Sequence, residues 1–208
     1  MNELTNEFSE LYEQERRRLR SFYDSLGDYA SPVFGEGDIN SKIMLIGEAP
    51  GKNEAEQGRA FVGKAGKQLN EMLELASLKR EQLFITNAVK FRPIRIAKSS
   101  ISNRTPTVKE IDSSLYVLKR EIELIQPKFV ITLGKTALTA VMKLTQADLS
   151  FTALKEIQGV PHSICANGFD FILYPMYHPA SVIYNPVLKE AMEMSLRRIP
   201  QILVQCEV

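Results

Sequence analysis

Apolar and polar positions along the chain follow two alternating patterns. Four short apolar runs, each ended by glycine or polar residues, have the length and composition of buried strands. They span residues 42–47, 83–89, 128–133 and 170–176. Around them, apolar residues recur at the spacing of an amphipathic helix. This second pattern predicts helices over residues 4–26, 66–78, 107–125, 135–144 and 186–204.

The alternation of strands with helices predicts the fold class. Strands joined through helices pair in parallel, and the helices then cover both faces of the sheet. We therefore expect an α/β fold, a three-layer α/β/α sandwich around a central four-stranded, mostly parallel sheet. Thr107 and Glu110 have the spacing of a capping box, which supports a helix start at that point. No repeat or linker divides the chain, so residues 1–208 are expected to form a single domain.

The segment 93–106 departs from this pattern. It is basic and rich in serine, and it is longer than a simple connection between a strand and a helix. Loops of such length often carry function. We therefore expect an extended functional loop here.

Composition narrows the class of protein. The chain has 208 residues, a formal net charge of +1 and two cysteines, Cys165 and Cys206. Two cysteines are too few for a disulfide framework or a four-thiolate metal site. The first residues are polar and acidic, unlike a signal peptide, and no apolar run approaches the ~20 residues that cross a bilayer. A cytoplasmic protein is expected, and any nucleic acid would be bound by a local basic patch.

Chemically useful residues follow the predicted strands. Gly47-Glu48-Ala49-Pro50-Gly51 comes after the first strand, Asn87 closes the second, and His178-Pro179-Ala180-Ser181 follows the last. In parallel α/β sheets, ligands bind in the crevice at the carboxyl ends of the strands. A carboxylate and an imidazole are therefore expected to face one small site.

The glycine-rich segment 58–66 nearly matches a phosphate-binding loop. Ala65 lacks the hydroxyl that would hold magnesium, and no strand directly precedes Gly58, so an ATPase is not expected. The glycines let the backbone approach closely, and the N-terminus of the next helix offers N–H groups to an anion such as a DNA phosphate. A turn into a helix without any ligand is the simpler alternative.

The order of these motifs, from about Lys42 to about Lys189, resembles the uracil-DNA glycosylase superfamily, and most closely its iron–sulfur branch. The resemblance implies a monofunctional DNA repair enzyme. Such an enzyme flips uracil out of DNA and hydrolyses its N-glycosidic bond, leaving an abasic site. Three alternatives stay open: a glycosylase for hypoxanthine or xanthine, a DNA-binding relative without catalysis, and a nucleotide-binding protein that uses the glycine-rich loop.

The resemblance implies roles in holding the base. Phe61 would stack on it, and Asn87 would pair with the N3–H and O4 of uracil, beside Gly47 and Ala49. Cytosine presents the opposite hydrogen-bond polarity, so a fixed amide would leave polar groups unpaired. Glu54 would fill the space that a thymine methyl group needs.

The resemblance also implies the catalytic pair. His178 would donate to uracil O2, where negative charge builds as the bond breaks. Glu48 would orient the attacking water or stabilise the cationic sugar, but it could equally brace its own loop.

A DNA surface is expected around the same site, because residues 83–109 contain several cations and no acid. Tyr184 would wedge into the duplex as the base leaves. The other expected DNA contacts are Gly63, Lys64, Gly66, Lys90, Arg92, Arg95, Lys98, Arg104 and Ser181.

The chain departs from the resembling branch at its cluster. That branch holds iron with four cysteines: a pair before the first strand, one after the second strand and one in the following helix. Here Phe91 and Ser114 stand at the last two positions, and the N-terminal region has no cysteine. We expect no metal and no cofactor, with Phe22, Tyr23, Phe91 and Ser114 filling the space. The expected partner is uracil-containing DNA, bound by a monomer.

Overall fold

The structure is a computed structural model that describes residues 3–23, 31–97, 100–147, 149, 153–182 and 185–206. The helices are α1 (Glu3–Tyr23), α2 (Lys52–Gln57), α3 (Lys64–Leu75), α4 (Val108–Ile125), α5 (Lys135–Thr145), α6 (Leu154–Ile157), α7 (Pro179–Val182) and α8 (Pro186–Gln205), with a 3₁₀ turn, η2 (Arg80–Gln82). The strands are β1 (Glu36–Gly37), β2 (Ile43–Gly47), β3 (Phe84–Asn87), β4 (Ile94–Ala97), β5 (Ser100–Asn103), β6 (Phe129–Leu133), β7 (His162–Ala166) and β8 (Phe169–Met176).

Six of the described strands form one large sheet in the order β1-β3-β2-β6-β8-β7, and β4 and β5 form a separate two-stranded sheet. The centre of the large sheet, β3-β2-β6-β8, is parallel and consists of the four strands predicted from the apolar runs. The expected strand number was wrong, because β1 and β7 add an antiparallel strand at each edge. Two-residue β1 is too short to leave a pattern, and β7 alternates buried and exposed positions without a continuous apolar run.

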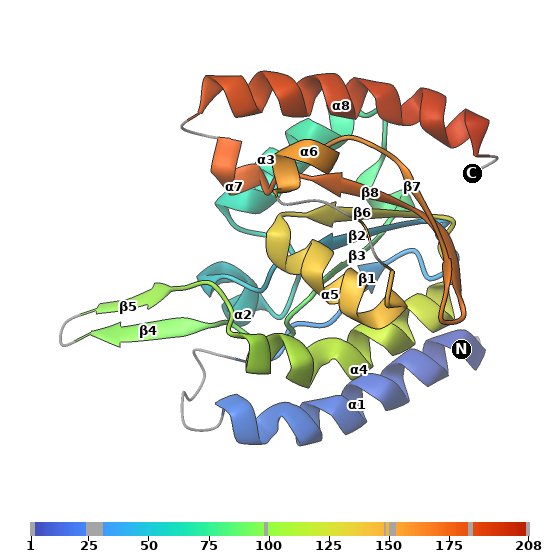
Figure 1. Ribbon diagram of the computed structural model, residues 1–208. Helices are drawn as coiled ribbons and strands as arrows, with labels where there is room; N and C mark the ends of the chain where they lie inside the picture. The colour runs from blue at the N-terminus through green and yellow to red at the C-terminus, as the bar shows by residue number, and fades with distance from the viewer. Residues whose placement is uncertain are drawn as a thin grey trace.

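Two hydrophobic cores lie on opposite faces of this sheet. Met44 and Ile46 of β2 point into a core shared with α1, α4 and α5. Leu45, between them, points into the other core, with α3 and α8. Figure 1 shows the same three layers, with α8 and α3 on one side of the sheet and α4 and α1 on the other. The expected α/β sandwich with a mostly parallel sheet is confirmed.

Local signals set the helix boundaries. Thr107 accepts a hydrogen bond from the N–H of Glu110, and the Glu110 carboxylate accepts one from the N–H of Thr107. This capping box starts α4 where the sequence predicts it. At α8, the side chain of Asn185 caps the helix and Pro186 follows at its first position, which suits proline because no N–H is needed there.

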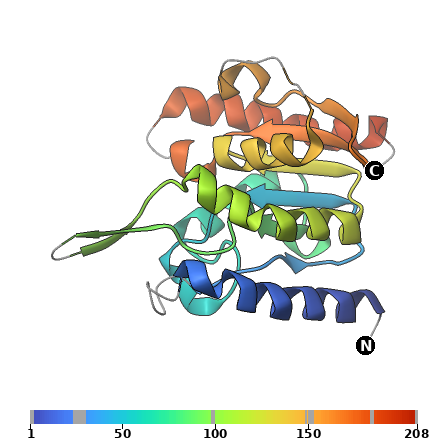
Figure 2. The same ribbon diagram turned by 60° about the horizontal axis from the view of Figure 1, so that its bottom comes forward.

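We expected the segment 93–106 to be an extended loop, and this expectation was wrong. The segment forms an antiparallel hairpin of β4 and β5. Ile94 and Ile96 alternate with Arg95, which is a strand pattern, but most of the hairpin is exposed and its apolar signal is short. Figure 2 shows the hairpin extending away from the body of the molecule. Its base lies at the edge of the sheet that carries the site.

Candidate active site

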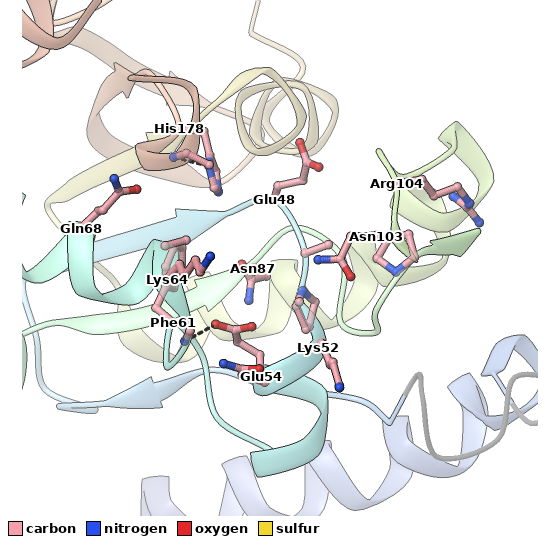
Figure 3. Close-up of a pocket in the computed structure, with 18 residues that line it drawn as sticks. Glu48, Lys52, Glu54, Phe61, Lys64, Gln68, Asn87, Asn103, Arg104 and His178 are labelled. Carbon is pink, nitrogen blue, oxygen red and sulfur yellow. Dashed lines mark hydrogen bonds between the residues drawn. The ribbon is translucent and has the colours of Figure 1, made fainter. Parts of the chain in front are cut away.

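The carboxyl ends of three central strands, β2, β3 and β8, meet around one pocket of about 480 Å³. Glu48 follows β2, Asn87 ends β3, Gly134 follows β6 and His178 follows β8. Figure 3 shows Glu48 and His178 on one side of this pocket and Lys52 and Glu54 on the other. Its lining residues include Glu48, Ala49, Glu54, Phe61, Gly63, Lys64, Gln68, Asn87, Asn103, Arg104, His178 and Ala180.

Gly47 brings the expected stacking ring and the expected base-reading amide together. A Cβ at Gly47 would lie 2.4 Å from Cζ of Phe61 and 2.4 Å from Oδ1 of Asn87. Both side chains therefore pack directly over this glycine. The sequence singled out all three residues. Phe61 and Asn87 line the pocket, and Gly47 lies beneath both side chains.

Phe61 is held in an uncommon backbone conformation. Its φ of +52° lies in the left-handed region, which costs free energy for a residue with a side chain. Gly66 makes this turn possible, because a Cβ there would lie 1.9 Å from the carbonyl oxygen of Phe61. Gly66 is thus required by the chain's own packing, which is a different reason from the expected approach of DNA.

Glu54 braces the same turn from α2. Its Oε1 accepts hydrogen bonds from the N–H groups of Gly63 (2.7 Å) and Val62 (3.1 Å), and its side chain is buried. A carboxylate at this helix N-terminus is favourable for the α3 dipole. The N–H of Gly63 is therefore already bonded, and the N–H groups that follow it in α3 are left for an external anion.

The Asn87 side chain faces the pocket without a fixed partner. The residue is 3% exposed, and within the described part of the chain its amide makes no hydrogen bond. Its amide atoms are not among the buried side-chain atoms without a partner, and Asn87 lines the pocket. Both the amide oxygen and the NH₂ group are therefore available to a ligand in the pocket.

His178 is oriented by its own turn. Its Nδ1 accepts a hydrogen bond of 3.2 Å from the N–H of Ala180, so the neutral ring carries its proton on Nε2. The hydroxyl of Ser181 donates to the carbonyl of His178 at 2.7 Å and fastens the turn. Gly134 lets the turn approach β6, since a Cβ there would lie 3.2 Å from Cβ of His178.

Burial and charge act in opposite directions on His178. Burial lowers the pKa of the imidazole below its ordinary value, and the nearby Glu48 carboxylate offsets part of that shift. The ring is therefore a neutral N–H donor at pH 7 rather than a cation. His162, on β7, also has a pKa lowered by burial but lies outside this pocket.

Glu48 is anchored at one oxygen. The hydroxyl of Thr136, in the first turn of α5, donates to Oε2 of Glu48 at 2.8 Å. No described residue donates a main-chain N–H to this carboxylate. The expected alternative, a carboxylate that braces its loop through N–H groups, lacks those bonds, and Oε1 is left for another partner.

Apart from Gly63 and Gly66, the expected DNA contacts divide into three groups. Lys64, Arg95 and Ser181 are exposed, and Arg104 lines the pocket while its guanidinium pairs with Glu110. Tyr184 and Lys98 lie outside the described residues. Lys90 and Arg92 are buried, so the expectation that they contact DNA is wrong.

The Lys90 side chain is 0% exposed and forms an ion pair of 2.6 Å with Glu121. Arg92 is 4% exposed, and its Nε donates to Oδ1 of Asn103 at 2.7 Å. In the sequence both cations resemble surface charges, because their partners, Glu121 and Asn103, are not their neighbours along the chain.

The residues at the expected cluster positions do not fit an iron–sulfur cluster. Phe91 is packed into a hydrophobic core, and Oγ of Ser114 accepts a hydrogen bond of 3.1 Å from the N–H of Lys90. Cys165 and Cys206 are free, on β7 and at the end of α8. The side chains of Phe22 and Tyr23 lie outside the described residues. Within the described ranges, no three His, Cys, Asp or Glu side chains are grouped to hold a metal.

Fold and pocket together define an α/β protein whose strand-end pocket is lined by an aromatic ring, a carboxylate and an imidazole. A family model described as the uracil DNA glycosylase superfamily matches residues 34–197. The chain therefore belongs to the uracil-DNA glycosylase superfamily. This confirms the family and the class of enzyme that the sequence motifs predicted.

Several curated relatives are similar over most of their length. A type-4 uracil-DNA glycosylase of Sulfurisphaera tokodaii is 36% identical over 173 residues, which is 83% of this chain and 74% of the relative. That of Saccharolobus solfataricus is 37% identical over 82% of this chain and 76% of the relative. That of Archaeoglobus fulgidus is 36% identical over 82% of this chain and 81% of the relative.

Sequence reasoning missed several residues that support or line the pocket. Thr136, which donates to Glu48, and Gly134, which packs against His178, follow β6 and lie behind the lining residues. The rule that ligands bind at strand ends would have pointed to both. Gln68 on α3 and Asn103 on β5 also line the pocket. They belong to no sequence motif, because only the tertiary fold brings them to the strand ends.

Across the described helices, none is long and apolar enough to cross a membrane.

Proposed function

We propose that this protein removes uracil from DNA by hydrolysing its N-glycosidic bond, leaving an abasic site. The observation that carries the proposal is the convergence of Phe61, Asn87, His178 and Glu48 on one pocket at the strand ends. Each supplies one part of the chemistry, from stacking to water activation. The names of the type-4 relatives support the choice of uracil.

Base recognition is assigned to Phe61 and Asn87. The uracil ring stacks on Phe61, and a stack of this kind contributes ~1–3 kcal/mol. The Asn87 amide oxygen accepts from N3–H, and its NH₂ group donates to O4. Glu54 lines the same pocket and supports the turn of Phe61, so it shapes the space beside the ring. That space is where a thymine methyl group would have to fit.

Bond cleavage is assigned to His178 and Glu48. The neutral imidazole donates its Nε2–H to O2 of uracil, and this hydrogen bond strengthens as negative charge develops on the leaving base. Glu48, held by Thr136 at Oε2, orients water or stabilises the positive charge on the sugar with its other oxygen. No lysine is assigned as a nucleophile, so the enzyme stops at the abasic site.

The DNA path is assigned to the rim of the pocket. Lys64 lies at the N-terminus of α3, where helix N–H groups bind phosphate. Arg104 and the exposed Arg95 extend the cationic rim along the hairpin. Ser181, in the His178 turn, and Tyr184 complete the assigned contacts. The proposal also holds that the protein acts on uracil-containing DNA as a monomer in the cytoplasm, and that it needs no cofactor.

The direct test is product analysis. Incubation with a duplex that contains one uracil should release free uracil, detected by chromatography, and leave an alkali-labile site. Borohydride should trap no covalent enzyme–DNA product, because the mechanism has no Schiff base. A trapped product, or an intact duplex, would refute this assignment.

A further inference from the structure

Lys90 and Glu121 form a buried ion pair directly behind the pocket wall. Both side chains are 0% exposed, and Nζ of Lys90 lies 2.6 Å from Oε2 of Glu121. Removing two charges from water is costly, and replacing such a pair with apolar residues is often neutral or stabilising. Stability alone therefore does not explain why the chain keeps this pair.

The Lys90 ammonium uses its three donors on three partners. Besides Glu121, Nζ donates to Oγ1 of Thr86 at 2.7 Å and to the main-chain oxygen of Asn87 at 2.7 Å. The Thr86 hydroxyl in turn donates to Oε2 of Glu121 at 2.9 Å. The carbonyl of Asn87 is thus held by a charge-assisted hydrogen bond from an ammonium whose three donors are all engaged.

Glu121 is itself fixed from the other side. Its Oε1 accepts hydrogen bonds from the Tyr12 hydroxyl and from the N–H of Gly35, each at 3.0 Å. Burial lowers the pKa of the Lys90 ammonium, and the Glu121 carboxylate opposes that shift. The pair is therefore anchored by α1, α4 and the segment before β1, while its only main-chain acceptor on β3 is Asn87.

The main chain that follows Asn87 is hydrogen-bonded to the main chain of Gly47 and Glu48. The N–H of Ala88 donates to the carbonyl of Gly47 at 2.8 Å, and the N–H of Val89 donates to the carbonyl of Glu48 at 3.0 Å. The Asn87 side chain, in contrast, has no partner of its own among the described residues. Its direction depends on how its main chain is held.

We propose that the Lys90–Glu121 pair positions Asn87 for reading uracil, by fixing its carbonyl and hence the direction of its amide. This inference rests on the proposed base-reading role of Asn87. Both charged residues are positioning residues, because neither lines the pocket. The expected consequence of losing the pair is weaker recognition of the base with unchanged contact to the rest of the DNA.

The test replaces both charges at once, as Lys90→Met with Glu121→Met, so that no lone charge is left buried. We expect a folded variant whose single-turnover rate on uracil DNA falls about tenfold or more, the effect of one misplaced hydrogen bond. Inhibition by free uracil should weaken by a similar factor. Affinity for a duplex without uracil should change less than about twofold, because the pair is out of reach of the phosphates.

Thr86→Val is the second variant, and it keeps the test decisive if the double variant does not fold. It removes the hydroxyl between the two charges and should shift the uracil inhibition constant in the same direction. Tyr174→Phe is the matched control, since it deletes a buried 2.9 Å hydrogen bond to the carbonyl of Ser195 that does not reach Asn87. It should leave uracil inhibition unchanged.

The positioning role would be overturned if the folded double variant and Thr86→Val were both inhibited by uracil, and both excised uracil, as the wild-type protein does. That result would leave the proposed function intact if Asn87→Ala is still impaired. A wild-type protein that does not excise uracil would instead refute the proposed function itself.

Discussion

The amide oxygen of Asn87 lies directly over Gly47: a Cβ at this glycine would be 2.4 Å from Oδ1. The ring of Phe61 approaches the same point equally closely. The last residue of β2 is therefore glycine because two side chains of the pocket occupy the space of its Cβ. The strand itself does not require it.

Gly47→Ala tests this packing. The added methyl group must displace the Phe61 ring, the Asn87 amide or both, and so should lower the single-turnover rate of uracil excision about 100-fold. Binding to a duplex without uracil should stay within about twofold, because the pocket lies apart from the phosphate contacts. A variant that excises uracil at the wild-type rate would show that the two side chains do not act on the base.

His178→Ala separates catalysis from binding. The hydrogen bond to O2 strengthens in the transition state, so its loss should lower the single-turnover rate by about 100-fold or more. Affinity for uracil DNA should fall much less. Equal losses in rate and affinity would make His178 a residue that positions the base rather than one that stabilises the leaving group.

The pKa of His178 is a further observable. Burial lowers it, so its NMR titration midpoint should lie below the ordinary value of 6.5. Glu48→Gln removes the opposing charge and should lower the midpoint further. His162 is the internal control, because its lowered pKa has burial as its cause and should not respond to Glu48.

The same shift fixes the sign of a stability effect. As pH falls through the ordinary histidine pKa, the unfolded chain takes up the proton before the folded protein does. The free energy of unfolding should therefore decrease as the pH drops from above 6.5 through the lowered pKa values of His162 and His178. A midpoint of His178 above 6.5 would contradict the neutral donor.

Iron content tests the absence of a cofactor. Phe91 and Ser114 supply no thiolates, and both are already engaged in packing or hydrogen bonding. We expect a colourless protein whose melting temperature and activity do not change with chelators. Stoichiometric iron and a brown absorbance in the pure protein would contradict this expectation.

The four central strands, and functional residues at the ends of three of them, could be predicted, because continuous apolar runs and the strand-end rule depend on local sequence. The positions of Glu48, Asn87 and His178 around one pocket followed directly. Lys90 could not be placed, because a lysine that directly follows an apolar run and stands near another cation, Arg92, resembles a surface charge. Its partner, Glu121, is on α4, and only the tertiary fold brings the two together.

Two other features show the same limit. Glu54 was expected to shape the base pocket, and its main-chain hydrogen bonds to Val62 and Gly63 could not be seen without the turn at Phe61. The hairpin of β4 and β5 was expected as a loop, because its strands are short and largely exposed. Exposed strands lack the apolar run that reveals buried ones.

The central claim is that Asn87 reads uracil in an excising pocket, and single-turnover excision across a set of bases tests it most directly. Oligonucleotides that carry uracil, cytosine, thymine, hypoxanthine or xanthine at one position should show uracil removed fastest by the wild-type protein. Asn87→Ala should lose most of this activity, since each unpaired polar group costs ~1–3 kcal/mol. Asn87→Asp, an acceptor without donors, should shift the preference from uracil toward cytosine. Equal rates on uracil and cytosine, or full activity of Asn87→Ala, would contradict the account.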